Sequence, residues 1–297
     1  MIRFRARPLP LLAGSALSVL LGACASRPAE PPGSPAKEMV YAVTASHQLI
    51  QFNAGQPQQL LARRQLDGLA PGDHLLGIDY RVARGQLFGL GASGQLYRIA
   101  PATGRATAVG APVALPREGA SEWGFDFNPT VDRIRVVNDK GFNLRLHPDT
   151  GAIVDAKPEQ TGLQLDEPLR YDSGDANAGK EPGIVAAGYS YNKDDEKITT
   201  NYALDGRLGT LVHQGSQEGV QPLISPNTGR LFTVGSLGIG SFAHASLDIS
   251  DVSNTAYTAV RQGSVSRWYR IELSSGRATL IGTIAGGEPV VGTAIEP

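Results

Sequence analysis

Three aspartates recur at one position of a repeated segment, and carboxylates arranged in this way could hold a divalent cation. Asp79, Asp126 and Asp248 would form a ring at the ends of innermost strands if the repeats were arranged around an axis. Calcium takes oxygen ligands of this kind, and some propeller hydrolases work through such a cation. The alternative is structural: each carboxylate accepts backbone N–H bonds from the turn that follows it. We favour the structural role, because a residue that the repeat itself needs should recur from unit to unit.

A second candidate metal or ligand site is the glycine-rich loop that contains Asp172, Asp175 and Asn177. Its three oxygen-bearing side chains within six residues are suitable calcium ligands. A complete EF-hand loop would need a glutamate at its twelfth position, and counting from Asp175 that position is Ala186. Side-chain-to-backbone turns explain the composition equally well. We therefore predict no cofactor and keep calcium as the alternative.

Three arginines alternate with apolar residues between positions 133 and 145. They are Arg133, Arg135 and Arg145. In strands this alternation places the arginines on one face and the apolar residues on the other. We expect a solvated blade face here, with contact to an anion or a glycan as the alternative.

Other familiar catalytic and cofactor patterns are missing from the sequence or have a simpler explanation. The five histidines show no ligand spacing, and the chain has one cysteine, Cys24, and no G-x-S-x-G or H-E-x-x-H motif. The glycines of residues 89–94 match G-x-G-x-x-G, but a strand follows them where a dinucleotide site requires a helix. We interpret these glycines as a hairpin turn and assign no catalytic and no cofactor-binding residue.

The elements that would position these residues are short strands. The chain has 297 residues with 36 Gly and 20 Pro, a composition that favours many short elements joined by turns. Gly77 and Asp79 recur 47 residues later as Gly124 and Asp126. Each unit contains four runs of alternating apolar residues separated by turn residues, which indicates antiparallel strands. Four strands that recur every forty to fifty residues are typical of a β-propeller blade.

We predict an all-β propeller of about five four-stranded blades. The five units are 39–66 with 290–297, 75–110, 122–165, 184–238 and 246–284. The fourth unit is degenerate, and its length leaves room for a sixth blade. The first unit lacks its leading strand, and residues 290–295 resemble that strand. We therefore expect the C-terminal strand to complete the first blade, which would remove an exposed sheet edge.

The N-terminus is typical of an exported lipoprotein. Residues 1–23 combine three arginines with a short apolar stretch, as a signal peptide does. Leu21-Gly22-Ala23-Cys24 resembles the lipobox of bacterial lipoproteins, which implies cleavage before Cys24 and lipid attachment to it. Residues 24–38 then form a proline-rich tether, and residues 39–297 form the propeller domain. Residue 25 is alanine and not aspartate, which implies that the lipoprotein is sorted to the outer membrane, where it faces the periplasm.

Residues 124–151 and 172–179 resemble a bacterial family known as domain of unknown function 4394. Its features here are the run Phe-Asp-Phe-Asn-Pro-x-x-Asp-Arg-Ile-Arg-Val-Val and the run Gly-Asp-Ala-Asn-Ala-Gly. The resemblance extends from about Leu75 to Ile295 and implies a β-propeller on an exported protein, with no activity attached.

The function that these observations favour is a binding or scaffolding lipoprotein of the cell envelope. Its partners would be the membrane, through the N-terminal lipid, and an envelope protein or polymer. The alternative is a metal-assisted hydrolase or lactonase with carboxylates at the channel. Without residues 1–23 the chain carries 24 basic and 28 acidic residues. This excess of acid argues against a nucleic-acid partner.

Overall fold

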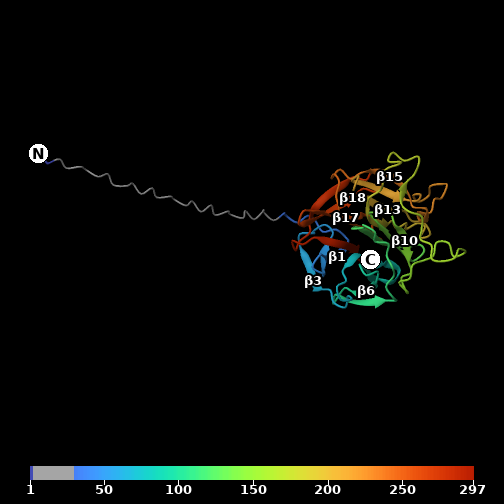
Figure 1. Cartoon of the computed structure of the whole chain (residues 1–297), viewed down its shortest axis with the longest axis horizontal. Coiled ribbons are helices and arrows are strands. Elements are labelled where there is room, and N and C mark those ends of the chain that lie inside the picture. Colours follow the sequence, from blue (N-terminus) through green and yellow to red (C-terminus); the bar gives the residue numbers. More distant parts are fainter. Residues whose placement is uncertain (3–29) are drawn as a thin grey trace.

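The computed structural model describes residues 1–2 and 30–297, and this part of the chain is a five-bladed β-propeller. Five sheets surround a central axis, and their colours follow the sequence around the ring in Figure 1. The five blades correspond to the five predicted repeat units, so the prediction of an all-β propeller is confirmed. The degenerate fourth unit forms one blade, which settles the count at five.

The strands of each blade run in order from the axis outward. Blade 1 contains β20 (Val290–Ile295), β1 (Met39–Thr44), β2 (Gln48–Asn53) and β3 (Leu60–Gln65). Blade 2 contains β4 (Leu75–Arg81), β5 (Gln86–Gly91), β6 (Leu96–Ala100) and β7 (Arg105–Val109). Blade 5 contains β16 (Ala245–Ile249), β17 (Ala256–Gln262), β18 (Val265–Ile271) and β19 (Ala278–Thr283).

Blades 3 and 4 depart from the four-stranded pattern. Blade 3 has three strands, β8 (Trp123–Asn128), β9 (Arg133–Asn138) and β10 (Asn143–Leu146), and an isolated bridge from Leu146 to Ile153 replaces the fourth. Blade 4 contains β12 (Ile184–Tyr189), β13 (Asn201–Asp205), β14 (Thr210–Gln214) and β15 (Arg230–Ser236). A short strand, β11 (Arg170–Tyr171), extends its outer edge in parallel. Two 3-10 turns complete the structure, η1 (Val82–Arg84) and η2 (Pro226–Thr228).

Close packing at the axis explains the glycine of the Gly-x-Asp repeat. The five inner strands β20, β4, β8, β12 and β16 contact one another around the axis. A Cβ atom on Gly124 would lie 2.7 Å from the backbone nitrogen of Ala187 in the next inner strand. A Cβ on Gly77 would meet the side chain of Phe125 at 2.9 Å. The glycines therefore allow adjacent inner strands to approach within van der Waals contact.

The predicted closure of the ring is confirmed. β20 pairs antiparallel with β1, with Val40 opposite Ile295 and Ala42 opposite Thr293. Strand β1 therefore has a partner on both sides, and the C-terminus lies near the centre of the ring (Figure 1). The expected hairpin at residues 89–94 is also present between β5 and β6, where Gly94 has a φ of +83°.

Residues 30–38, the later part of the expected tether, lie against blades 1 and 5. The backbone N–H of Ala36 donates to Asn53 Oδ1 at 2.7 Å, and Asn53 Nδ2 donates back to the Ala36 carbonyl. Glu38 is buried and accepts hydrogen bonds from Ser253 and Tyr257 of blade 5.

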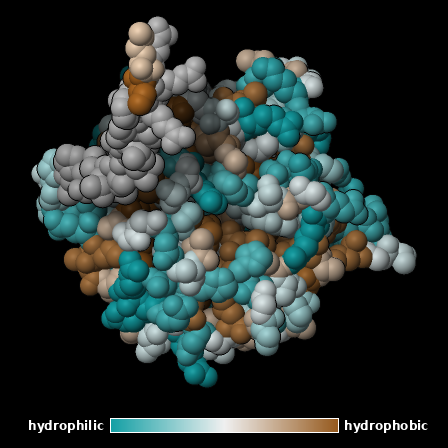
Figure 2. All heavy atoms as spheres, turned by 60° about the vertical axis from the view of Figure 1, so that its left-hand side comes forward, coloured by the Kyte–Doolittle hydropathy of each residue, from teal (hydrophilic) through white to brown (hydrophobic). Residues whose placement is uncertain are grey.

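Hydrophilic and hydrophobic residues are interspersed on the side of the propeller seen in Figure 2.

The expected signal peptide, apart from residues 1–2, and the expected lipid attachment site Cys24 lie outside the described residues. Within the described part of the chain, no helix has the length and apolar composition needed to cross a membrane.

Candidate functional site

The structure brings Asp79, Asp126 and Asp248 together at the axis. They project from the inner strands β4, β8 and β16, and one carboxylate oxygen of each lies within 4.8 Å of the others. All three are buried, with exposed fractions of 2–5%. In the described part of the chain, this carboxylate cluster is the one group of acidic or histidine side chains close enough to hold a metal ion.

The carboxylate cluster accepts backbone hydrogen bonds from all five inner strands. Each aspartate binds the next inner strand around the ring: Asp79 Oδ2 accepts from Phe127, Asp126 Oδ1 from Tyr189 and Asp248 Oδ2 from Ile295, at 2.5–2.8 Å. Asp79 Oδ1 and Asp248 Oδ1 accept from the residues that follow them, Tyr80 and Ile249. The carboxylates thus serve as backbone acceptors, as expected, but most of their donors lie in the neighbouring blade and not in a following turn.

Burial and mutual repulsion change the protonation of the carboxylate cluster. Burial raises the pKa of Asp79 and Asp126 well above the ordinary range, and the charges of the other carboxylates raise both further. Burial raises the pKa of Asp248 to about 7. Asp126 and Asp79 also share a side-chain hydrogen bond, which lowers the pKa of Asp79 and raises that of Asp126. Both oxygens of Asp79 accept backbone N–H bonds, whereas Asp126 accepts one through Oδ1, so Oδ2 of Asp126 is a position at which a proton shared within the cluster can sit.

The carboxylate cluster has little access to a substrate. On one side the channel between the inner strands holds a cavity of only about 10 Å³. On the other side a cavity of about 410 Å³ is lined by Tyr191, Arg81 and Asp251, while the three clustered aspartates do not line it. Burial and the charges of Asp79, Asp126 and Asp248 raise the pKa of Tyr191, which lines this cavity. This geometry is suited to joining blades more than to metal-assisted hydrolysis.

The loop with Asp172, Asp175 and Asn177 is held by hydrogen bonds to its own backbone and to β15. Asp175 accepts from the Asn177 backbone at 2.8 Å and from both the backbone and the hydroxyl of Thr233. Asp172 accepts from the Gly174 backbone and forms an ion pair with Arg230. Asn177 donates to Thr233 Oγ1 and accepts from Lys180. The oxygens of the loop are therefore occupied by N–H and O–H donors.

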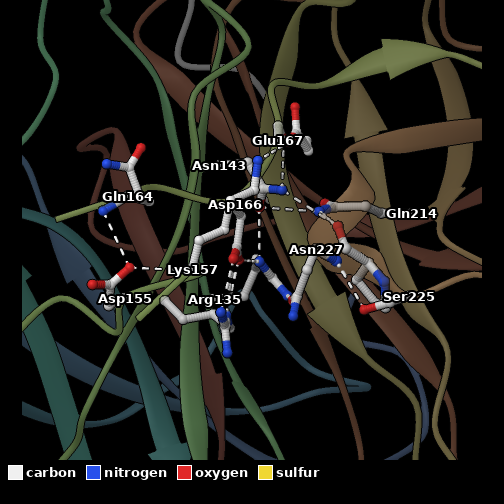
Figure 3. Close-up of polar contacts among 12 residues, drawn as sticks. Arg135, Asn143, Asp155, Lys157, Gln164, Asp166, Glu167, Gln214, Ser225 and Asn227 are labelled. Carbon is white, nitrogen blue, oxygen red and sulfur yellow. Dashed lines mark hydrogen bonds and ion pairs between the residues drawn. The ribbon is translucent and has the colours of Figure 1, made fainter. Parts of the chain in front are cut away.

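The expectation of a solvated arginine face is wrong for Arg135. Arg135 and Arg145 lie opposite each other on β9 and β10, as the alternation predicts. However, only 2% of the Arg135 side chain is exposed, because loops from blades 3 and 4 cover it. It pairs with the fully buried Asp166 and donates to Asn143 and Asn227 (Figure 3). Burial favours loss of its charge, but Tyr189 and Asp166 outweigh this effect and raise the pKa of Arg135.

Asp166 is shared by two arginines. Arg145 donates to it through Nε at 2.9 Å and Nη2 at 2.8 Å, a two-pronged ion pair. Gln214 and Asn143 tie this cluster to blade 4 through a 3.1 Å hydrogen bond and a bond from Gln214 to the Pro226 carbonyl (Figure 3). One carboxylate, that of Asp166, therefore faces two guanidinium groups, and this group of three charged side chains carries an excess positive charge.

A groove of about 620 Å³ opens above this cluster, between blades 3 and 4. We call it the arginine groove. Its cationic lining residues are Arg133, Arg135, Arg145 and Lys197, and its one acidic lining residue is Glu218. Glu218 already accepts hydrogen bonds from Ser190, Asn192 and the Thr200 backbone. The arginine groove is thus concave, open and positively charged.

Sequence reasoning did not identify Asp166, Asn227 or Gln214 as parts of this site. Asp166 lies in an irregular segment and Asn227 in the 3-10 turn η2, both between strands, where the repeat makes no prediction. Gln214 ends a strand of the degenerate fourth unit. The one signal in the sequence was the alternation of the three arginines, which marked the correct face without showing what covers it.

A comparison with protein families matches residues 48–294 to the family described as Domain of unknown function (DUF4394). The match spans most of the chain, and the protein belongs to this family. It begins at Gln48, earlier than the resemblance noted from the sequence. No curated protein matches the chain.

Solved structures similar to the chain include two from Bacteroides thetaiotaomicron and one from Lactobacillus plantarum. A structural genomics protein of unknown function from the first organism is 13% identical, with a TM-score of 0.47, over 83% of this chain and 58% of its own. An auxiliary nutrient binding protein from the same organism is 14% identical, with a TM-score of 0.41, over 82% and 58%. The Lactobacillus protein is 15% identical, with a TM-score of 0.37, over 82% and 70%. The chain thus spans less than two thirds of the first two structures.

Proposed function

We propose that this member of the DUF4394 family is an envelope-anchored lipoprotein whose propeller binds a ligand without transforming it. The observation that carries the proposal is the arginine groove, an open pocket above a fixed positive cluster. Binding sites are commonly concave, with apolar walls and a few polar groups held in place. The one acidic side chain that lines the groove, Glu218, is already held by Ser190, Asn192 and the Thr200 backbone, which supports binding more than acid–base catalysis.

Anchoring is the second part of the proposal. The lipobox-like Leu21–Cys24 segment and the proline-rich residues after it support lipid attachment at Cys24. Residues 30–38 pack on blades 1 and 5, so the segment between the lipid and the domain would be residues 25–29. The propeller would then be held close to the membrane, which we propose is the outer membrane on its periplasmic side.

The test compares the parent with Cys24→Ser in a Gram-negative host. We expect the parent to be labelled by a fatty-acid probe and to fractionate with outer membranes. The variant should be unlabelled and should accumulate unprocessed or soluble. A variant that is still labelled would refute anchoring at Cys24. Metal analysis of the purified protein tests the binding assignment separately: a stoichiometric metal that Asp126→Asn removes would favour the metal-assisted hydrolase or lactonase instead.

A further inference from the structure

The arginine groove combines a positively charged floor with an apolar rim. Four large apolar residues that line the groove are exposed: Val131, Ile198, Val220 and Leu223. Leu223 is 77% exposed and Val131 57% exposed. Single exposed apolar side chains are ordinary, but several around one pocket mark a surface that gains from being covered.

The charge of the floor is not balanced by the protein. The four cationic lining residues face two carboxylates, Glu218 and the buried Asp166. Within the described part of the chain, Nη1 of Arg145 and Nε and Nη2 of Arg133 have no hydrogen-bond acceptor, since the hydrogen bonds of these two side chains use their other nitrogens. The Arg145 side chain is 18% exposed, so its unused edge is accessible from the groove. Arginine presents such an edge to carboxylates as a planar pair of donors.

We infer that the arginine groove binds an amphipathic organic carboxylate of the medium-chain acyl type. Its carboxylate would pair with Arg145 and Arg133, and its apolar chain would lie on Val131, Val220 and Leu223. The inference rests on the proposed binding function and names the class of ligand. Asp166 holds Arg145 through two nitrogens and Arg135 through one, so the donor edge is fixed before the ligand arrives. A preorganised cation of this kind loses little conformational entropy on binding.

The experiment measures binding of decanoate to the purified propeller by isothermal titration calorimetry. Acetate and inorganic phosphate test the anionic head alone, decanol tests the chain alone, and decyltrimethylammonium reverses the charge. We expect saturable binding of decanoate and at least about tenfold weaker binding of each of the other four, since both ends contribute. Equal affinity for phosphate would reduce the site to an anion site, and equal affinity for decanol would reduce it to an apolar one. Either result, or no saturable binding of decanoate, would overturn the inference.

Variants locate the site. Arg145→Gln should weaken decanoate about tenfold or more, because it removes a charge-assisted hydrogen bond, while Arg98→Gln removes an exposed arginine of blade 2 and should change nothing. Leu223→Ser alters a side chain that is mostly exposed, so it should leave folding intact and still weaken decanoate. Equal losses in Arg145→Gln and Arg98→Gln would indicate unspecific charge attraction and refute the site. If decanoate fails while Cys24 is acylated as expected, the ligand class is wrong and the anchoring proposal stands.

Discussion

A substitution in the carboxylate cluster can distinguish a structural role from a metal site, because the two roles predict stability changes of opposite sign. Asp126 accepts the Tyr189 N–H through Oδ1, and burial raises its pKa and favours the protonated form, whose O–H can bond to Asp79. An asparagine at this position can keep the first bond through its carbonyl and replace the shared proton with an amide N–H. We therefore expect Asp126→Asn to mimic the protonated residue permanently and to fold as the parent does.

The magnitude follows from linkage between protonation and folding. A carboxyl whose pKa is raised on folding stabilises the protein fully below its unfolded pKa of about 3.9, and this contribution is lost as pH rises through the folded pKa. For Asp248 this stability is lost as the pH rises to about 7. The raised pKa values of Asp79 and Asp126 extend the loss of stability to higher pH. In this window the folded state holds protons that the unfolded state has released. For each such proton, a rise of one pH unit lowers the free energy of unfolding by about 1.4 kcal/mol.

The assay is denaturant unfolding of the parent and of Asp126→Asn at pH 5, 6, 7 and 8. The variant should match the parent within about 1 kcal/mol at pH 5, as expected for a replacement that keeps the hydrogen bonds. It should become more stable than the parent by pH 8, because it cannot ionise and because it removes a like charge beside Asp79 and Asp248. Burial also raises the pKa of Glu122 to about 8, so the difference between the two proteins is the quantity to compare.

Asp248→Asn is the matched control. Both oxygens of Asp248 accept backbone N–H bonds, from Ile249 and Ile295, so an amide must leave one of them without an acceptor. We expect this variant to lose about 1–3 kcal/mol at pH 5. The reasoning is refuted if Asp126→Asn is less stable than the parent at pH 8. It also fails if calcium stabilises the parent and not Asp126→Asn, which would indicate a metal site.

Two further predictions concern the closure and the loop. Deleting residues 290–297 removes β20 and leaves the β1 edge open, so the truncated protein should aggregate or lose its cooperative melting transition in calorimetry; an unchanged transition would contradict the closure. Asp175→Ala removes acceptors for Thr233 and Asn177 and should cost about 1–3 kcal/mol in unfolding experiments, equally in calcium and in EDTA. A calcium-dependent stabilisation that this substitution abolishes would restore the metal interpretation of the loop.

The sequence predicted the propeller because its repeat acts at the level of the backbone. Gly77 and Gly124 recur where inner strands approach most closely, and the alternation of apolar residues marks strands whatever covers them. The same logic brought Asp79, Asp126 and Asp248 to one level of the axis, because equal positions in equal blades are neighbours around a ring.

The arginine groove could not be predicted in the same way. Alternation shows on which face Arg135 and Arg145 lie, but burial depends on the loops that cover that face. The loop that contains Asp166 and the turn that contains Asn227 are insertions without a counterpart in the other blades. Their positions are determined by long-range contacts such as the Arg135–Asn227 hydrogen bond, which joins residues 92 positions apart.

The number of aspartates in the carboxylate cluster follows from the number of inner strands. Five backbone N–H groups meet at this level, and a carboxylate offers two oxygens, so three carboxylates are enough for all five. The positions equivalent to these aspartates in β12 and β20 are Gly188 and Ala294, which offer no acceptor. In the strands that follow them, Ile249 and Tyr80 donate instead to the second oxygen of their own aspartates. An aspartate in every blade would add buried negative charge without any N–H to receive it. Three aspartates are therefore sufficient for a structural role in this five-bladed ring, and such a role does not need an aspartate in every blade.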